Sequence, residues 1–169
     1  MLRYSTLCGA LLAISCGASA PLAPRDPSAH IAVLPAEDEA ILLAVVEHIM
    51  KASPHGASAP ICLVIRVTQS QMGDPSVALL DTARDEWPSM VQDSACEGGG
   101  PDDNVRLRAS RKEAYRIDIG PVTKDGANAA RVVGGDLYAG GSGTSEIEYK
   151  LTREGGTWRV VSQRTLLMI

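Results

Sequence analysis

Histidine is the side chain that most often transfers protons near neutral pH, and this sequence contains three, at positions 30, 48 and 55. His48 directly follows Glu47 within a predicted helix. Adjacent helical side chains point in different directions, so these two do not form an acid–base dyad. We therefore interpret His48 as a residue on a solvated helix face.

Two carboxylates, Glu146 and Glu148, alternate within a predicted strand, so they lie on the same face, about 7 Å apart. Glycosidases use paired carboxylates at a comparable separation, but they also need a cleft and one carboxyl that stays protonated. Alternation with apolar residues puts this pair on the polar face of the strand. We therefore expect both carboxylates to be solvated and without a catalytic role.

Two glycine-rich stretches suggest phosphate or calcium binding at first inspection. The stretch 140–143 (GGSG) lacks both the GxxxxGK[ST] pattern of a phosphate loop and the G-x-S-x-G spacing of a nucleophile elbow. Glu97, Asp102 and Asp103 lack the alternating ligand register of a calcium loop. The sequence thus predicts no catalytic, cofactor-binding or metal-binding residue.

The first 15 residues have the pattern of an export signal peptide. Arg3 supplies a positive charge, residues 7–14 are mostly apolar, and small residues follow. The apolar run is too short to span a bilayer, and no later stretch is long and apolar enough to do so. We therefore predict an exported protein with residues 1–15 removed.

The sequence AISC at residues 13–16 resembles the lipobox of bacterial lipoproteins, although Ala13 stands where leucine is commonest. The resemblance implies that Cys16 is acylated and becomes the new N-terminus. The protein would then be a cell envelope lipoprotein that reaches the membrane through its lipid anchor alone. The alternative is ordinary cleavage near position 18 or 20, which gives a periplasmic or secreted protein.

Residues 16–35 are rich in alanine, proline and serine and show neither helical nor strand periodicity. Such a composition favours an extended tether, which leaves 36–169 as a single domain. Removal of residues 1–15 takes away one cation and no acid, so the formal charge changes from −4 to −5. This acidic balance argues against nucleic acid and anionic lipid surfaces as partners, because both attract clustered cations.

Two cysteines, Cys62 and Cys96, remain beyond the signal region. Neither has a cysteine or histidine nearby at metal-ligand spacing. In an oxidising compartment an even pair of this kind is expected to form a structural disulfide. We predict a Cys62–Cys96 bond that ties the first strand to a glycine-rich loop.

The middle of the chain predicts two helices and a strand. Residues 37–52 place Ile41, Val45 and Ile49, among other apolar residues, on one helical stripe. The β-branched run 61–67 predicts a strand. Asp74-Pro75 predicts the cap and first turn of a short helix that ends before Trp87-Pro88. We expect residues 90–104 to form a long exposed loop and 105–110 to form an edge strand.

Residues 114–169 predict a four-strand antiparallel meander. Tyr115, Ile117 and Ile119 alternate with Arg116 and Asp118, which indicates one apolar and one solvated face. Alternation continues through Ile147, Tyr149 and Leu151, and glycine turns at 125–126 and 155–156 separate strands. We expect Trp158, Tyr149 and Ile117 to share one core beneath the first helix. The final apolar run, 166–169, lies either centrally in the sheet or under the helix.

This order of elements predicts an α+β fold, with an N-terminal helix and a short second helix packed on a curved antiparallel sheet. The strand pattern that ends in TWRVV (157–161) is weakly similar to the end of cystatin-like and nuclear-transport-factor-2-like domains. That likeness covers residues 114–169 and implies a fold but no activity.

Two hypotheses of function follow. The first is a non-enzymatic envelope-tethered or secreted domain that binds a protein of the cell envelope or a small ligand. The second is a small enzyme with a pocket between helix and sheet. Polar groups converging in such a pocket would favour the enzyme, but the inward positions that we infer are Ile, Leu, Val, Tyr and Trp.

Overall fold

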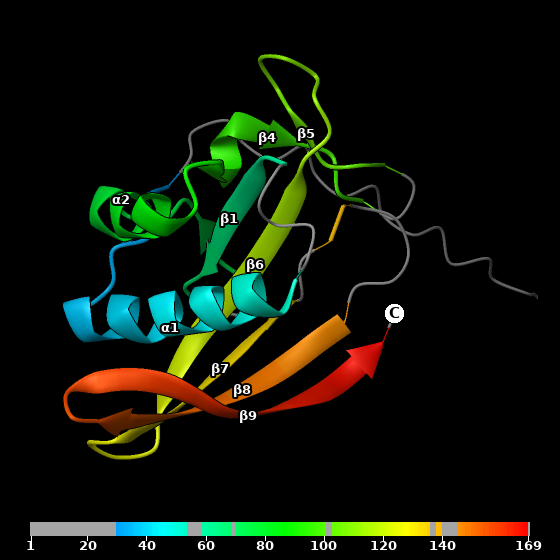
Figure 1. The fold of residues 1–169 in the computed structure, drawn as a ribbon. Coiled ribbons are helices and arrows are strands. Elements are labelled where there is room, and N and C mark those ends of the chain that lie inside the picture. The colour runs from blue at the N-terminus through cyan, green and yellow to red at the C-terminus, as the bar shows by residue number, and fades with distance from the viewer. Residues whose placement is uncertain are drawn as a thin grey trace, which may run out of the picture.

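The computed structural model describes residues 30–53, 59–68, 70–100, 103–135, 138–139 and 145–168. Our predictions for the signal peptide, for the lipobox cysteine Cys16 and for the glycine-rich stretch 140–143 fall outside these ranges. Within them the chain forms an α+β fold, in which two helices accompany a curled and mostly antiparallel sheet (Figure 1).

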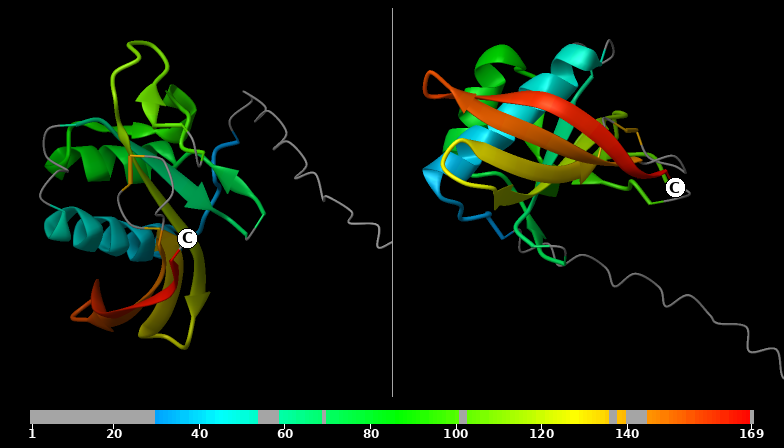
Figure 2. Two further views of the ribbon diagram at one scale, coloured as in Figure 1. Left: turned by 90° about the vertical axis from the view of Figure 1, so that its right-hand side faces the viewer. Right: turned by 90° about the horizontal axis from the view of Figure 1, so that it is seen from below.

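The first helix, α1 (Ala36–Ala52), confirms the prediction from helical spacing. Acidic residues occupy its first turn and Lys51 its last, and both placements complement the helix dipole. One stripe of α1 is buried, and it consists of Ile41, Leu42, Val45, Val46, Ile49 and Met50. Figures 1 and 2 show α1 lying in the concave side of the curled sheet, which is where this stripe becomes buried.

The predicted C-terminal meander is confirmed as four consecutive antiparallel strands. The main sheet has the order β2-β1-β6-β7-β8-β9, and β3 also pairs with β1. The strands are β1 (Ile61–Arg66), β2 (Met72–Gly73), β3 (Met90–Gln92), β6 (Tyr115–Lys124), β7 (Ala129–Gly135), β8 (Ser145–Glu154) and β9 (Thr157–Met168).

The sheet is not antiparallel throughout, because β1 runs parallel to both β6 and β3. The residues from Ile61 to Ile65 are all buried, at 1% exposure or less. A strand covered on both faces has no solvated side on which to place polar residues, so it reads as an unbroken apolar run. Its other edge is shared by β2, which pairs near Ile65, and β3, which pairs near Ile61.

A bulge between Ile119 and Val122 interrupts the pairing of β6 with β7. Gly120 lies within it at a φ of +107°, a conformation that glycine adopts readily. A side chain there would place its Cβ 2.3 Å from the carbonyl oxygen of Arg66 in the neighbouring strand. Glycine therefore permits the close approach of β1 to β6, and bulges of this kind bend a strand.

The second helix, α2 (Val77–Glu86), ends before Trp87 as predicted, but its cap differs from the prediction. The cap is Ser76, whose Oγ accepts a hydrogen bond of 3.1 Å from the Leu79 amide. Asp74 is instead buried at 5% exposure, and its Oδ1 accepts a hydrogen bond of 2.8 Å from the Ser94 amide. The aspartate therefore fixes a neighbouring segment, while the nearer serine caps the helix.

The prediction of a long exposed loop over residues 90–104 is wrong. This region contains β3, a 3₁₀ turn (Asp93–Ala95) and β4 (Cys96–Glu97), and Met90 and Cys96 are almost fully buried. The expected edge strand survives only as β5 (Arg106–Leu107), which pairs with β4 in a small separate sheet. The polar and glycine-rich composition indicated an exposed loop, but Met90 and Cys96 within it are buried.

The predicted core is confirmed. Trp158, Tyr149 and Ile117 belong to one buried cluster with the α1 stripe, and they are 5%, 1% and 0% exposed. The space between α1 and the inner face of the sheet is thus occupied by apolar side chains, as the strand alternation indicated.

We left two positions open for the final apolar run 166–169, central in the sheet or under the helix, and the central one is wrong. β9 is the last strand in the sheet order, and Leu166 is 42% exposed. The pairing of β8 with β9 shifts register twice, so that Val161 and Leu166 are extra residues on β9 without a direct partner in β8. Both are exposed, as is every residue of β9 from Val161 to Leu166.

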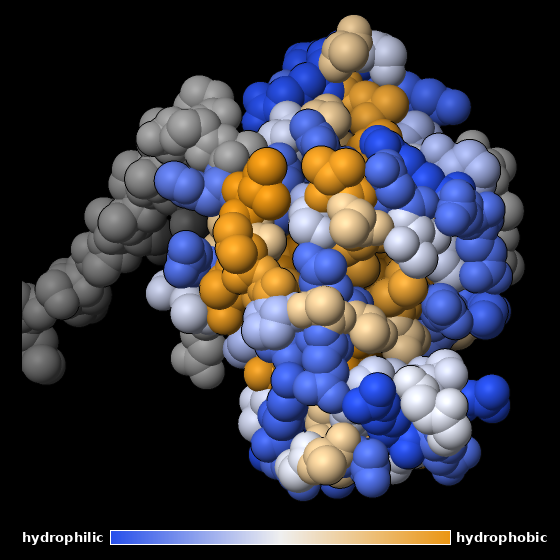
Figure 3. Space-filling model, turned by 90° about the vertical axis from the view of Figure 1, so that its left-hand side faces the viewer, coloured by the Kyte–Doolittle hydropathy of each residue, from blue (hydrophilic) through white to orange (hydrophobic). Residues whose placement is uncertain are grey.

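The chain ahead of α1 is docked on the domain from His30 onward, although its composition favours a tether. Ala32 donates a backbone hydrogen bond of 2.9 Å to Asp74, and the Asp74 amide donates one of 3.0 Å to His30. Ala32 is buried, whereas Ile31 and Val33 on either side of it are 57% and 90% exposed. Figure 3 shows apolar side chains gathered on the face of the molecule where α2 and the start of α1 lie.

Candidate functional site

A groove of about 590 Å³ lies between α1 and the first half of β9. From α1 it is lined by Leu43, Ala44, Glu47 and His48, and from β9 by Trp158 and Val160, among others. The sequence predicted the buried stripe of α1 but not this adjoining face. The signal for it was present, because Leu43 and Ala44 widen the apolar surface of α1 beyond a single stripe.

His48 is partly exposed in this groove, where it also contacts the sheet. Its Nε2 lies 2.8 Å from Oε1 of Gln163 in β9, and its ring meets Tyr149 edge-on at 6.0 Å between centroids. Glu47 forms an ion pair of 3.2 Å with Lys51, one helical turn away. The two neighbours thus have separate partners, and His48 links α1 to the sheet.

One edge of β9 pairs with β8, and the opposite edge ends the sheet within the described residues. From Val161 to Leu166 every residue of β9 is exposed. Arg159 and Arg164 are exposed on this strand, and the Arg164 side chain is 69% exposed. An open strand edge is a row of hydrogen-bonding backbone groups that another strand can use.

The outer face of the sheet carries ion pairs, and the expectation that Glu148 is solvated is wrong. Glu148 is 8% exposed, and its carboxylate lies 3.2 Å from Arg164 and 3.7 Å from Arg131. Glu146 pairs with Arg66 at 3.3 Å. Cations of the two neighbouring strands therefore cover Glu148, whereas the Glu146 side chain stays 40% exposed. The alternation within a single strand does not show the difference.

Arg66 is held most firmly, by two hydrogen bonds of 2.8 and 2.9 Å to the carboxylate of Asp118. Burial of Arg66 lowers its pKa, but the hydrogen bonds with Asp118 and Glu146 outweigh this and raise the pKa above its ordinary value. The pair links β1 to β6 across their parallel register. We therefore interpret the ion pairs of Arg66 with Asp118 and Glu146 as contacts that hold the strands together.

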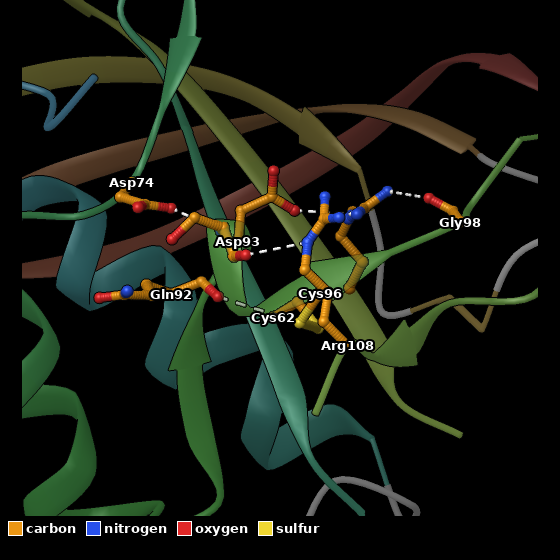
Figure 4. The surroundings of a disulfide bond; sticks show 9 residues. Cys62, Asp74, Gln92, Asp93, Cys96, Gly98 and Arg108 are labelled. Atoms are coloured by element: carbon orange, nitrogen blue, oxygen red, sulfur yellow. Dashed lines mark hydrogen bonds and ion pairs between the residues drawn. A yellow bond between two sulfur atoms is a disulfide. The ribbon is translucent and has the colours of Figure 1, made fainter. Parts of the chain in front are cut away.

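The predicted disulfide is confirmed: Cys62 in β1 is bonded to Cys96 in β4 (Figure 4). The segment that it holds covers Arg116, which we expected on a solvated face but which is 5% exposed. The Arg116 guanidinium lies 2.9 Å from Asp93 and donates a hydrogen bond of 2.9 Å to the Gly98 carbonyl. A second layer, formed by the 3₁₀ turn and β4, thus covers this part of the sheet.

Among the described residues, no group of three His, Cys, Asp or Glu side chains is arranged to hold a metal ion. Glu97, considered above for calcium, forms an ion pair with Arg111. In the same part of the chain, no helix has the length and apolar character needed to cross a bilayer.

The chain matches no family model, no curated protein and no solved structure. Inferences about function therefore rest on the groove, the β9 edge and the surface charges themselves.

Proposed function

We propose that this protein is an exported domain, anchored to the cell envelope through a lipid on Cys16, that binds an extended acidic segment of a partner protein along β9. The proposal is supported chiefly by the 12-residue strand β9, which ends the sheet within the described residues and lies beside a groove with both apolar and polar lining residues. The proposed binding mode is the addition of one strand to an existing sheet, in which backbone hydrogen bonds give affinity and side-chain pockets give specificity.

Export is supported by the buried Cys62–Cys96 disulfide, because such bonds persist in oxidising compartments. The signal pattern and the AISC sequence at 13–16 support the anchor. Fatty-acid labelling in cells tests it: label on the native protein and its loss in Cys16→Ser are expected. Label that persists in Cys16→Ser, or none on the native protein, contradicts the anchor.

The charges beside the groove favour an acidic partner. The chain as a whole carries a formal charge of −4, yet Lys51 and Arg159 line the groove, and Arg164 is exposed further along β9. Glu47 pairs with Lys51 and Glu148 with Arg164, so each of these carboxylates is balanced by a cation and Arg159 adds a positive charge. A margin with a net positive charge on an acidic protein favours segments of opposite charge.

The same charges disfavour a second copy of this chain as the occupant. In an antiparallel pair of β9 strands centred between Val161 and Ser162, Arg159 of each copy would face Arg164 of the other. Like charges directly opposite one another across two strands are destabilising.

A peptide of alternating threonine and glutamate is a direct probe of this site. We expect it to shift the backbone NMR resonances of β9 and of the α1 face at Leu43 and Ala44. A threonine–lysine peptide of the same length should bind at least tenfold more weakly. A form N-methylated at every second residue should not bind, because it cannot form the strand hydrogen bonds.

Charge reversal on the protein supplies the matched control. Arg164→Glu should weaken binding of the acidic peptide severalfold, whereas Lys112→Glu, an exposed cation in a distant turn, should not. Equal binding of acidic and basic peptides, or shifts that avoid β9, would contradict the proposed site.

A further inference from the structure

The docked start of the chain fixes where any N-terminal anchor attaches to the domain. The segment at His30 lies directly against Gly73 of β2, where an added Cβ would be 2.2 Å from the His30 carbonyl oxygen. Together with the two backbone hydrogen bonds between this segment and Asp74, the missing side chain lets the chain lie flat on the domain edge. The anchor therefore connects beside β2 and α2, at the opposite end of the sheet order from β9.

Exposed apolar side chains surround this attachment point. Ile31 and Val33 flank the docked Ala32, while Met72 and Val77 lie within three residues of Asp74, to which Ala32 is bonded. We name these four residues the tether-root patch, and their exposures are 57%, 90%, 40% and 68% for Ile31, Val33, Met72 and Val77. They are four of the six large hydrophobics described as exposed, the others being Val161 and Leu166 on β9. Figure 3 shows the apolar face to which α2 contributes.

The length of chain ahead of His30 brings this patch close to an anchored membrane. Thirteen residues, 17–29, separate Cys16 from His30. Even fully extended they span at most about 45 Å, and a domain of this size is itself about 35 Å across. The tether-root patch adjoins the point where the tether joins the domain, so the anchor keeps it within about 45 Å of the lipid surface, at a high effective concentration.

The charges around the patch indicate which lipid surface fits. Asp81, Asp85 and Glu86 on α2 are exposed, and although Asp81 pairs with Arg84 at 3.7 Å, the three acids outnumber this cation. Their negative charge opposes contact with anionic headgroups. A zwitterionic surface carries no such penalty, and apolar side chains at an interface gain by inserting between its headgroups.

We infer that the tether-root patch rests on the zwitterionic lipid surface of the membrane that anchors the protein, and that β9 is thereby turned away from the bilayer. This inference rests on the proposed anchor at Cys16. It assigns the domain an orientation in which the membrane covers Ile31, Val33 and Val77 while the binding edge faces outward.

The test uses the chain from Cys16 to Ile169, with its disulfide intact and the Cys16 thiol coupled to a maleimide lipid in phosphatidylcholine vesicles. Because the coupling is chemical, its outcome is independent of whether cells acylate Cys16. A tryptophan is placed by Val33→Trp in the patch, or by Val161→Trp on β9 as a matched control at another exposed valine. Brominated lipids then report which tryptophan contacts the bilayer.

We expect brominated lipid to quench the Val33→Trp chain at least twofold more than the native chain, and the Val161→Trp chain no more than the native chain. Adding Ile31→Ser and Val77→Ser to Val33→Trp should abolish the extra quenching. Equal quenching of the two tryptophan variants, or stronger quenching at position 161, would overturn the orientation.

A second measurement excludes another occupant of the patch. The native chain capped at Cys16 and free of vesicles should sediment as a monomer. A dimer that Val33→Ser with Val77→Ser dissociates would overturn the inference, because a second copy would then cover the patch.

Discussion

Cys62 and Cys96 are joined with their Cα atoms 6.4 Å apart, although 34 positions separate them in the chain. Cys62 lies in β1, the strand that is buried on both faces, and Cys96 lies in β4 of the layer that covers Arg116. The bond therefore attaches a short and irregular cover to the most buried strand of the sheet. Both sulfur-bearing residues are at most 1% exposed.

Loss of this bond should destabilise the domain substantially. In the chain-entropy model a closed loop of this length contributes about 4 kcal/mol. We expect the double variant Cys62→Ala with Cys96→Ala to lose about that much free energy of unfolding in urea. The reduced native chain should lose a similar amount, and a loss below about 1 kcal/mol in both would mean that the cover is held without the disulfide.

Removal of Asp93 should lower the free energy of unfolding, because it leaves the buried Arg116 guanidinium without an anionic partner. The Arg116 side chain is 6% exposed and would retain the Gly98 carbonyl but lose its anionic partner. Breaking a buried pair from one side typically costs 3–5 kcal/mol, and we expect about 3 kcal/mol for Asp93→Ala because Asp93 is partly exposed. Adding Arg116→Met should recover part of this loss. No recovery would indicate that Asp93 acts mainly through its other contacts.

Trp158 should contribute strongly to the core. Truncation of a large buried aromatic side chain costs about 3–5 kcal/mol, and Trp158→Ala is expected to fall in this range in urea unfolding. Val161→Ala, three positions along the same strand but 57% exposed, should change stability by less than about 0.5 kcal/mol. Similar losses from both would place Trp158 at the surface.

Gly73→Ala should release the docked start of the chain without unfolding the domain. The added Cβ collides with the backbone of His30, so the hydrogen bonds between Ala32 and Asp74 cannot form as they do now. We expect faster hydrogen exchange at the amides of Ala32 and Asp74, with the strand β8 unchanged. Gly100→Ala is the control, because a Cβ there meets no atom within 4 Å.

The ion pairs of Glu37 should make stability fall in acid. The hydrogen bond from Lys124, at 2.7 Å, lowers the pKa of Glu37, and Arg153 adds a smaller effect. A lowered pKa in the folded state gives stability that is present above the unfolded value, about 4.3, and is lost as the pH falls through the folded pKa.

We therefore expect Glu37→Gln to melt below the native protein at pH 6 and to match it near pH 2. Glu39→Gln is the control in the same helical turn, because the described residues offer Glu39 no ion-pair partner. A difference between the native and Glu37→Gln proteins that does not change with pH would rule out the ionic origin of the effect.

Local patterns in the sequence determined the elements of this fold. The 3.6-residue spacing of Ile41, Val45 and Ile49 determined α1 and its buried stripe, since a helix places such residues on one side whatever it packs against. Strand alternation around Ile117 and Tyr149 likewise determined the inner face of the meander. The pairing of Cys62 with Cys96 followed from their being the two cysteines beyond the signal region.

Tertiary structure decided what covers each surface, because burial depends on neighbours that are distant in sequence. Arg116 alternates like a solvated residue, but β4 and the 3₁₀ turn cover it. Leu166 belongs to an apolar run, yet its strand ends the sheet and its side chain is exposed. The β9 edge and the groove beside α1 arise in the same way, since a strand's own residues do not specify which strand stands last or which helix lies alongside it.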